Sequence, residues 1–208
     1  MSDILNKLAT HRLIPVIALD HEEDAVPLAD ALITGGLPVA EVTFRTAAAE
    51  SAIREMSKRR EMLVGAGTVL DVDTVKRAVD AGAMFIVSPG FGEKVVAYCV
   101  DHKIPVAPGC VTPTEIQMAL EHGISTVKFF PAEAVGGIKT LKAFAAPFGQ
   151  VRFIPTGGIT EANLCDYLSF APVVACGGSW MVTKELLAAG DFAKITSITA
   201  KAVQMAKK

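Results

Sequence analysis

The sequence predicts an α/β fold in which eight buried, parallel strands alternate with helices. Short runs rich in Val, Ile and Phe recur at intervals of about 20 to 26 residues. Several of these runs are almost continuously apolar, as is usual for parallel strands that are buried on both faces. Helical patterns with one apolar side lie between them. Eight strand–helix units in one chain favour a TIM barrel, also written (β/α)8.

The expected strands follow one another in the order of the chain. They are Leu13–Leu19, Val39–Phe44, Met62–Val69, Met84–Ser88, Ile104–Ala107, Ser125–Phe130, Val151–Pro155 and Val173–Cys176. An open, doubly wound sheet is the alternative. It is less favoured because the first strand is followed by Asp20 and His21 rather than by a glycine-rich phosphate turn.

The segments between the strands have helical signatures. Residues His21–Thr34, Ala47–Arg60 and Thr74–Ala81 place apolar residues on one side and charges on the other. A further helix is expected to begin after Thr112, because Thr112, Pro113 and Glu115 form a capping box with proline at the first helical position.

Length and composition indicate one domain over residues 1–208, without a second domain or a linker. The chain is 51% apolar and 20% charged, a composition that excludes a disordered protein. Its net charge of −2 gives no indication of nucleic-acid binding. The longest uncharged stretch, Tyr167–Thr183, is interrupted by Pro172 and Gly177, so no membrane span is expected. We therefore expect a cytoplasmic protein.

The second strand carries polar residues at alternate positions. Because side chains alternate along a strand, Glu41, Thr43 and Arg45 share one face and are expected to point into the mouth of the barrel. An internal Glu41–Arg45 ion pair that only fills the barrel is the alternative. It is disfavoured because residues four apart on a strand are separated by about 13 Å.

The sixth strand contains an unusual lysine. Lys128 lies among apolar residues within a strand, whereas lysines such as Lys58 and Lys94 lie in helical or loop patterns that face water. A buried lysine needs a reason, and loss of solvent favours the neutral, nucleophilic amine. Lys128 is therefore a candidate nucleophile. A lysine that reaches the barrel rim or pairs with Glu41 is the structural alternative.

Two glycine pairs stand at the ends of the last two strands, namely Gly157-Gly158 and Gly177-Gly178. Barrel enzymes commonly bind phosphate in this region with backbone N–H groups. Tight turns without a ligand are the alternative. Thr68, which ends the third strand, and Pro89, which follows the fourth, give weaker signals.

No metal or cofactor is expected. The histidines (His11, His21, His102 and His122) fall outside the predicted carboxyl ends of the strands, and the cysteines (Cys99, Cys110, Cys165 and Cys176) lack a metal-binding spacing. The cysteines are interpreted as small apolar residues, two of which, Cys110 and Cys176, lie near strand ends.

These features together resemble the KDPG aldolase family, the 2-dehydro-3-deoxy-phosphogluconate aldolases that also act on 4-hydroxy-2-oxoglutarate. The resemblance covers nearly the whole chain, and its motifs keep the family's order. Phe44, on the outward face, stands where leucine is more usual. The motifs are Glu41–Thr46, Val64–Val69, Val127–Glu133 (VKFFPAE), Pro155–Ile159 and Gly177–Trp180.

The resemblance implies a role for each site residue. Lys128 forms a Schiff base with the substrate ketone, and Glu41 acts as general acid and base. The pyruvate half is bound by Arg45 and Thr68 at its carboxylate and enclosed by Pro89 and Phe130. The hydroxyl and phosphate half is bound by Thr156, Gly157, Gly158, Gly178 and Ser179.

The expected reaction is the cleavage of 2-dehydro-3-deoxy-6-phosphogluconate to pyruvate and glyceraldehyde 3-phosphate, a step of the Entner–Doudoroff pathway. Cleavage of 4-hydroxy-2-oxoglutarate to pyruvate and glyoxylate is expected as well, and the resemblance also suggests a homotrimer. Three alternatives remain open from the residues: a phosphosugar isomerase or epimerase, an aldolase for the phosphogalactonate stereoisomer, and a phosphate-binding module without activity.

Overall fold

In a computed structural model that describes residues 2–207, strands and helices alternate along the chain until β8, which is followed by two helices. The strands are β1 Leu13–Ile17, β2 Val39–Thr43, β3 Leu63–Gly67, β4 Ile86–Val87, β5 Val106–Ala107, β6 Thr126–Phe129, β7 Arg152–Pro155 and β8 Cys176–Gly178. The α-helices are α1 Ser2–His11, α2 Ala25–Thr34, α3 Ala49–Ser57, α4 Val72–Asp80, α5 Glu93–Asp101, α6 Pro113–Glu121, α7 Gly137–Ala145, α8 Leu164–Leu168, α9 Lys184–Ala188 and α10 Phe192–Ala206. Two short 3-10 helices are η1 Glu22–Asp24 and η2 Glu133–Val135.

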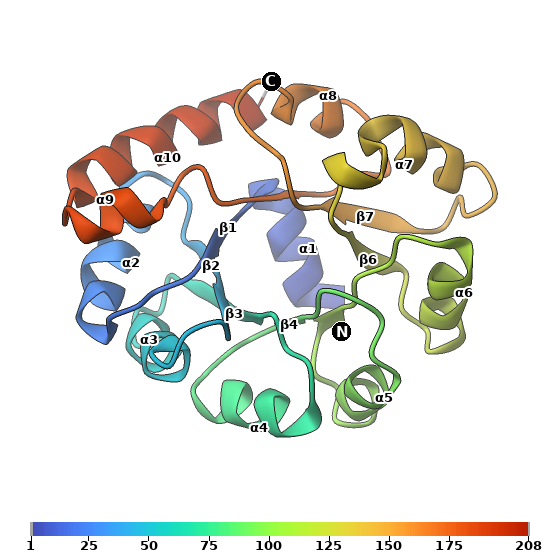
Figure 1. The fold of residues 1–208 in the computed structure, drawn as a ribbon, viewed down its shortest axis with the longest axis horizontal. Helices are drawn as coiled ribbons and strands as arrows, with labels where there is room; N and C mark the ends of the chain where they lie inside the picture. Colours follow the sequence, from blue (N-terminus) through green and yellow to red (C-terminus); the bar gives the residue numbers. More distant parts are fainter. Residues whose placement is uncertain (1, 208) are drawn as a thin grey trace.

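The strands pair in parallel. Six form a sheet in the order β5-β4-β3-β2-β1-β8, and β6 pairs with β7 in a second sheet. Isolated parallel bridges lie between the sheets, from Gly109 to Lys128 on one side and from Thr156 to Gly177 on the other. Helices α2 to α10 surround the strands (Figure 1). The expected α/β fold with parallel strands is confirmed, but continuous ladders do not close the two sheets into one.

Most strands are shorter than the apolar runs that predict them. Strand β8 lies further along the chain than its predicted run. The expected run Val173–Cys176 overlaps β8 only at Cys176, and the Gly177-Gly178 pair, expected as a turn, is part of the strand. This expectation was wrong because Val173 and Ala175 are buried but form no continuous ladder, Val173 having only an isolated bridge to Phe153. Gly177 and Gly178 instead pair with Ile14 and Pro15 of β1.

The helix that starts the chain was not expected from the sequence. Its residues Leu5 and Asn6 line a cavity with Val106 and with Gly123–Thr126, at the amino-terminal ends of β5 and β6. In the view of Figure 1, α1 is seen in the middle of the ring of strands. The end of the strands opposite to α1 is therefore the one that is left for a site.

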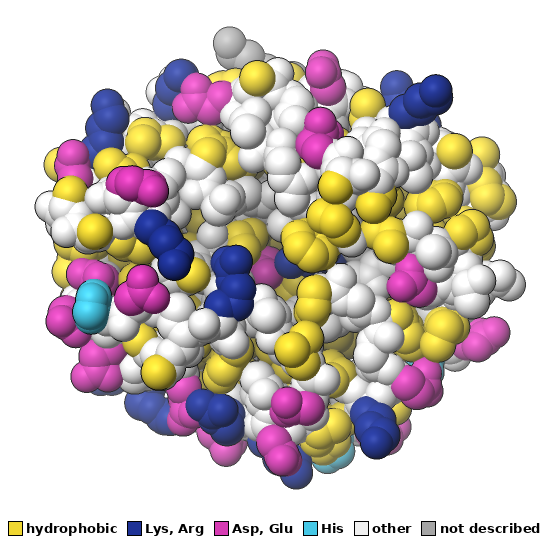
Figure 2. All heavy atoms as spheres, viewed as in Figure 1, with side chains coloured by type: hydrophobic (Ala, Val, Ile, Leu, Met, Phe, Trp, Pro, Cys, Tyr) yellow, Lys and Arg dark blue, Asp and Glu magenta, His cyan; other side chains and the backbone are white. Residues whose placement is uncertain are grey.

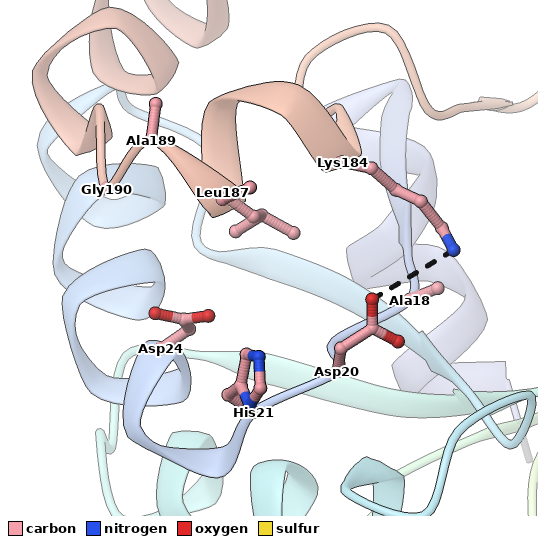
Figure 3. A pocket seen from close by; sticks show the side chains of 9 residues that line it. Ala18, Asp20, His21, Asp24, Lys184, Leu187, Ala189 and Gly190 are labelled. Atoms are coloured by element: carbon pink, nitrogen blue, oxygen red, sulfur yellow. Dashed lines mark ion pairs between the residues drawn. The ribbon is translucent and has the colours of Figure 1, made fainter.

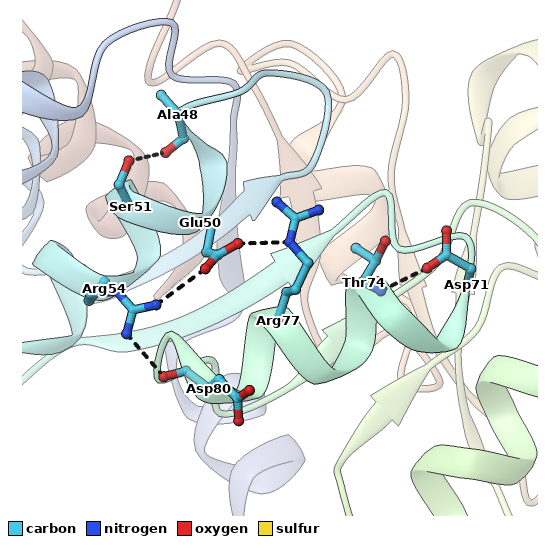
Figure 4. Close-up of polar contacts among 8 residues, drawn as sticks. All are labelled: Ala48, Glu50, Ser51, Arg54, Asp71, Thr74, Arg77 and Asp80. Atoms are coloured by element: carbon cyan, nitrogen blue, oxygen red, sulfur yellow. Dashed lines mark hydrogen bonds and ion pairs between the residues drawn. The ribbon is translucent and has the colours of Figure 1, made fainter.

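The outer helices are joined by polar contacts as well as by the core. Glu50 of α3 accepts hydrogen bonds from Arg54 (3.2 Å) and from Arg77 of α4 (2.7 Å), and Arg54 also donates to the carbonyl of Asp80 (Figure 4). The Arg77 hydrogen bond holds the pKa of Glu50 below its usual value. The expected capping box of α6 is confirmed, because Thr112 accepts from the backbone N–H of Glu115.

None of the helices in the described part of the chain combines the length and the apolar character that a membrane span requires.

Candidate active site

A small cavity of about 70 Å³ lies at the carboxyl ends of the strands. It is formed by residues from six different strands or strand ends, so it exists only because the fold brings these ends together. Its lining residues are Val16, Glu41, Thr43, Arg45, Thr68, Pro89, Lys128, Phe130 and Thr156. All residues that the sequence assigned to bond cleavage and to the pyruvate half line this inner cavity.

Lys128 and Glu41 meet at the centre of the inner cavity. The Nζ atom of Lys128 donates to Oε1 of Glu41 at 3.0 Å, and the two residues are only 5% and 2% exposed. The pairing that sequence analysis treated as a structural alternative therefore exists. It also places a carboxylate where it can exchange a proton with the amine or with a group bound to it. Buried charges that pair in this way are expected at functional sites.

Arg45 is oriented by its own strand. Its Nε donates to the hydroxyl of Thr43 at 3.0 Å, and that hydroxyl donates to the carbonyl of Ile17 on β1 at 2.7 Å. The structure places no ion pair between Arg45 and Glu41 among the contacts of the described chain, consistent with the expected separation along the strand. The guanidinium is thus held at the mouth of the cavity with donors left for an anion.

Thr68 has a strained backbone at the end of β3. Its φ is 57°, in the left-handed region that β-branched residues rarely adopt. Such strain persists only where the surroundings impose it, and it is often found at functional sites. With this backbone conformation, Thr68 lines the wall of the inner cavity, as Pro89 does.

Phe130 and Thr156 complete the wall. The Nζ atom of Lys128 lies 5.1 Å from the centroid of the Phe130 ring, which shields the amine from solvent. Thr156 is 5% exposed and lies against Gly177, where any side chain would collide with its hydroxyl. Thr156 therefore belongs to the inner cavity rather than to the outer part of the site.

A second, outer cavity of about 440 Å³ shares Val16 and Arg45 with the inner one. Gly158 and Ser179 line it, as predicted for the phosphate half. Gly157 and Gly158 turn sharply, with φ of 97° and 80°, whereas Gly178 is covered by the ring of Trp180. The predicted phosphate residues thus differ in access: Gly158 and Ser179 are exposed, and Gly178 is buried. The space-filling view shows charged side chains of both signs around a central hollow, with hydrophobic side chains beside it (Figure 2).

The loop after β6 is held against the turn after β7. Ala132 donates its backbone N–H to the carbonyl of Thr156 (2.8 Å), and Glu133 donates to that of Gly157 (3.1 Å). The carboxylate of Glu133 accepts a short hydrogen bond from Tyr167 of α8. Burial, followed by this bond, raises the pKa of Tyr167. The contacts fix Phe130 and the glycine turn relative to each other.

Val16 and Gly67 are site residues that sequence analysis missed. Val16 lines both cavities, and Gly67 packs against the side chain of Glu41, where a Cβ atom would lie 2.7 Å from Cγ. Gly67 could have been found as the small residue just before Thr68, but its contact with Glu41 depends on the pairing of β2 with β3.

Possible metal ligands do not cluster within residues 2–207. No group of three or more His, Cys, Asp or Glu residues there could hold a metal ion. Cys110 and Cys176 are buried at strand ends as expected, and burial raises the pKa of Cys110 to about 12. Cys165, by contrast, is exposed, so it does not fill the core as a small apolar residue would.

Comparisons with known proteins agree on one family over nearly the whole chain. The model of the KDPG and KHG aldolase family matches residues 4–198. A 2-dehydro-3-deoxy-phosphogluconate aldolase of Treponema pallidum is 50% identical over 206 residues, covering 99% of this chain and 98% of the relative. A KHG/KDPG aldolase of Escherichia coli K12 is 46% identical, covering 96% and 94%. A solved KDPG aldolase of Legionella pneumophila, with pyruvate captured as a covalent carbinolamine, is 38% identical with a TM-score of 0.92, covering 96% and 98%.

Proposed function

Because this chain belongs to the KDPG and KHG aldolase family, we infer that it is a carbon–carbon lyase that works through an imine on Lys128. Its proposed substrate is 2-dehydro-3-deoxy-6-phosphogluconate, which it cleaves to pyruvate and glyceraldehyde 3-phosphate. Cleavage of 4-hydroxy-2-oxoglutarate to pyruvate and glyoxylate is the second proposed activity. The observation that carries this inference is the buried Lys128–Glu41 contact of 3.0 Å in a cavity lined by Arg45.

The chemistry begins at the substrate ketone, C2. The neutral amine of Lys128 adds to C2 to form a carbinolamine, which loses water to give an iminium ion. The iminium draws electrons from the C3–C4 bond as that bond breaks. The C4 hydroxyl loses its proton, C4 leaves as the aldehyde, and C3 remains in an enamine. Protonation of C3 and addition of water at C2 then release pyruvate and the free lysine.

Glu41 is the proposed proton carrier. Its carboxylate can accept a proton during carbinolamine formation and, through a water molecule, from the C4 hydroxyl, and it can return a proton to C3. The low exposure of both residues limits the access of bulk water, and Glu41 is the carboxylate that lines the inner cavity, which favours it as the proton carrier.

The remaining residues bind the two ends of the substrate. Arg45, oriented by Thr43, and Thr68 are proposed to bind the carboxylate next to C2, and Pro89 and Phe130 enclose the three carbons of the pyruvate half. Thr156, which lines the inner cavity, is proposed to contact the substrate hydroxyls. Gly157, Gly158, Gly178 and Ser179 are proposed to hold the phosphate, with Gly158 and Ser179 in direct contact.

Reduction with borohydride in the presence of pyruvate tests the proposed function. One reduced pyruvate adduct is expected per chain, located at Lys128 by peptide mass spectrometry. The variant Lys94→Met, which changes an exposed lysine of α5, should still form the adduct. An unchanged protein mass would sink the imine mechanism and would favour an isomerase or a binding module.

Gly67→Ala is expected to lower kcat by about 10²-fold or more, because the new methyl group would push the Glu41 side chain away from Lys128. Gly149→Ala is the matched control, since no atom lies within 4 Å of its added methyl group. The measurement is the steady-state kcat of each of the two variants. Equal rates for both would show that the position of Glu41 does not limit the reaction.

We propose that the chain forms one (β/α)8-barrel domain in which the two sheets close through the bridges at Gly109 and Gly177. The homotrimer implied by the family resemblance can be tested by sedimentation, and the cytoplasmic location by cell fractionation. The choice between the gluconate and galactonate substrates can be tested by comparing kcat/KM for the two.

A further inference from the structure

A third cavity, of about 500 Å³, adjoins the outer cavity of the site, and the two share Ala18 and Lys184. Lys184 begins the short helix α9, and Asp20 lies on the loop after β1 (Figure 3). The Nζ atom of Lys184 is 4.0 Å from Oδ2 of Asp20, and the two side chains are 72% and 59% exposed. An ion pair that is this long and this exposed contributes little and is easily exchanged for another partner.

The charges on the outer cavity single out Lys184. Its ionisable lining residues are Arg45, Lys184 and Glu185. Arg45 is held by Thr43 at the boundary with the inner cavity. The carboxylate of Glu185 is engaged by its own backbone N–H and by Thr183, which lower its pKa. On the wall away from Arg45, Lys184 is therefore the cation available to an anion that enters beside Gly158 and Ser179.

We propose that Lys184 binds the phosphate of the substrate by leaving Asp20, and that this makes it a specificity-determining residue for phosphorylated keto-acids. The inference rests on the proposed aldolase function. A lysine ammonium is a compact charge on a flexible stem, so it can move between two anions. A phosphate group carries a larger charge than a carboxylate and has three acceptor oxygens, so it competes well for the ammonium. Asp20 holds Lys184 at the cavity when substrate is absent.

The test compares two substrates that differ only in the phosphate group, 2-dehydro-3-deoxy-6-phosphogluconate and its dephosphorylated form. Lys184→Met is expected to lower kcat/KM for the phosphorylated substrate by about tenfold, mainly through KM, and to leave the other substrate unchanged. Asp20→Asn is expected to raise kcat/KM for the phosphorylated substrate by about two- to fivefold, because Lys184 then has no competing partner. Lys94→Met, with the same loss of charge on α5 and outside the lining of the three cavities, should change neither.

Inorganic phosphate provides an independent readout as a competitive inhibitor. Its inhibition constant should rise about tenfold in Lys184→Met and stay constant in Lys94→Met. Equal effects of Lys184→Met on both substrates, or no effect on either, would overturn the proposal. Because the wild-type protein is first shown to trap pyruvate on Lys128, such a result would refute only the role of Lys184. Absence of trapping would instead refute the aldolase function.

Discussion

Replacing Lys128 by methionine is expected to lower kcat/KM for cleavage by about 10⁴-fold or more, because the variant has no amine to form the imine. Methionine is unbranched, apolar and only one heavy atom shorter than lysine, so the inner cavity should nearly keep its shape. Steady-state kinetics measure the loss. Borohydride with pyruvate should leave the mass of the variant unchanged.

The stability of this variant has to be measured alongside, since methionine leaves Glu41 buried without its ion-pair partner. Lys128→Arg is the matched control, because a guanidinium can still pair with Glu41 but is not a nucleophile. Both variants should be inactive, and Lys128→Arg should unfold closer to the wild-type temperature. Full activity in a folded Lys128→Arg protein would rule out an imine at this position.

The fold could be predicted from the sequence where burial and strand pairing coincide. Strands β1 to β7 lie within apolar runs, since parallel strands covered on both faces need apolar residues throughout. In β8 the two properties separate: Val173 and Ala175 are buried outside the strand, and two glycines form most of the strand. Glycine adds nothing to a hydrophobic pattern, so the pattern could not reveal this strand. Glycine is required at position 177 because Thr156 lies too close for any side chain there.

The candidate site could be predicted where it depends on the alternation of side chains along one strand. Glu41, Thr43 and Arg45 share a face, and all three line the inner cavity. The Lys128–Glu41 contact joins residues 87 positions apart and depends on how the strands are arranged in space. Lys184 could not be found either, because a lysine on a short polar helix looks like any solvated charge until its neighbouring cavities are known.

Replacing Glu41 by glutamine is expected to reduce kcat by about 10² to 10⁴-fold, because the amide can accept the Lys128 hydrogen bond but cannot carry a proton. The two side chains have nearly the same size, so KM should change little. Pyruvate should still be trapped on Lys128 by borohydride, although more slowly. Glu121→Gln, at the exposed end of α6, is the control and should behave as the wild type.

Hydrogen exchange at the methyl group of pyruvate separates the role of Glu41 in proton transfer from a role in holding Lys128. In the wild type, the pyruvate imine and its enamine interconvert, so the methyl protons of pyruvate should exchange with deuterium from the solvent. NMR spectroscopy can follow this exchange. A variant that traps pyruvate but no longer exchanges its methyl protons has lost the proton carrier alone. If Glu41→Gln abolishes trapping as well, Glu41 acts mainly by holding Lys128 in place. If exchange proceeds at the wild-type rate, another group carries the proton, and the buried Lys128–Glu41 pair is structural.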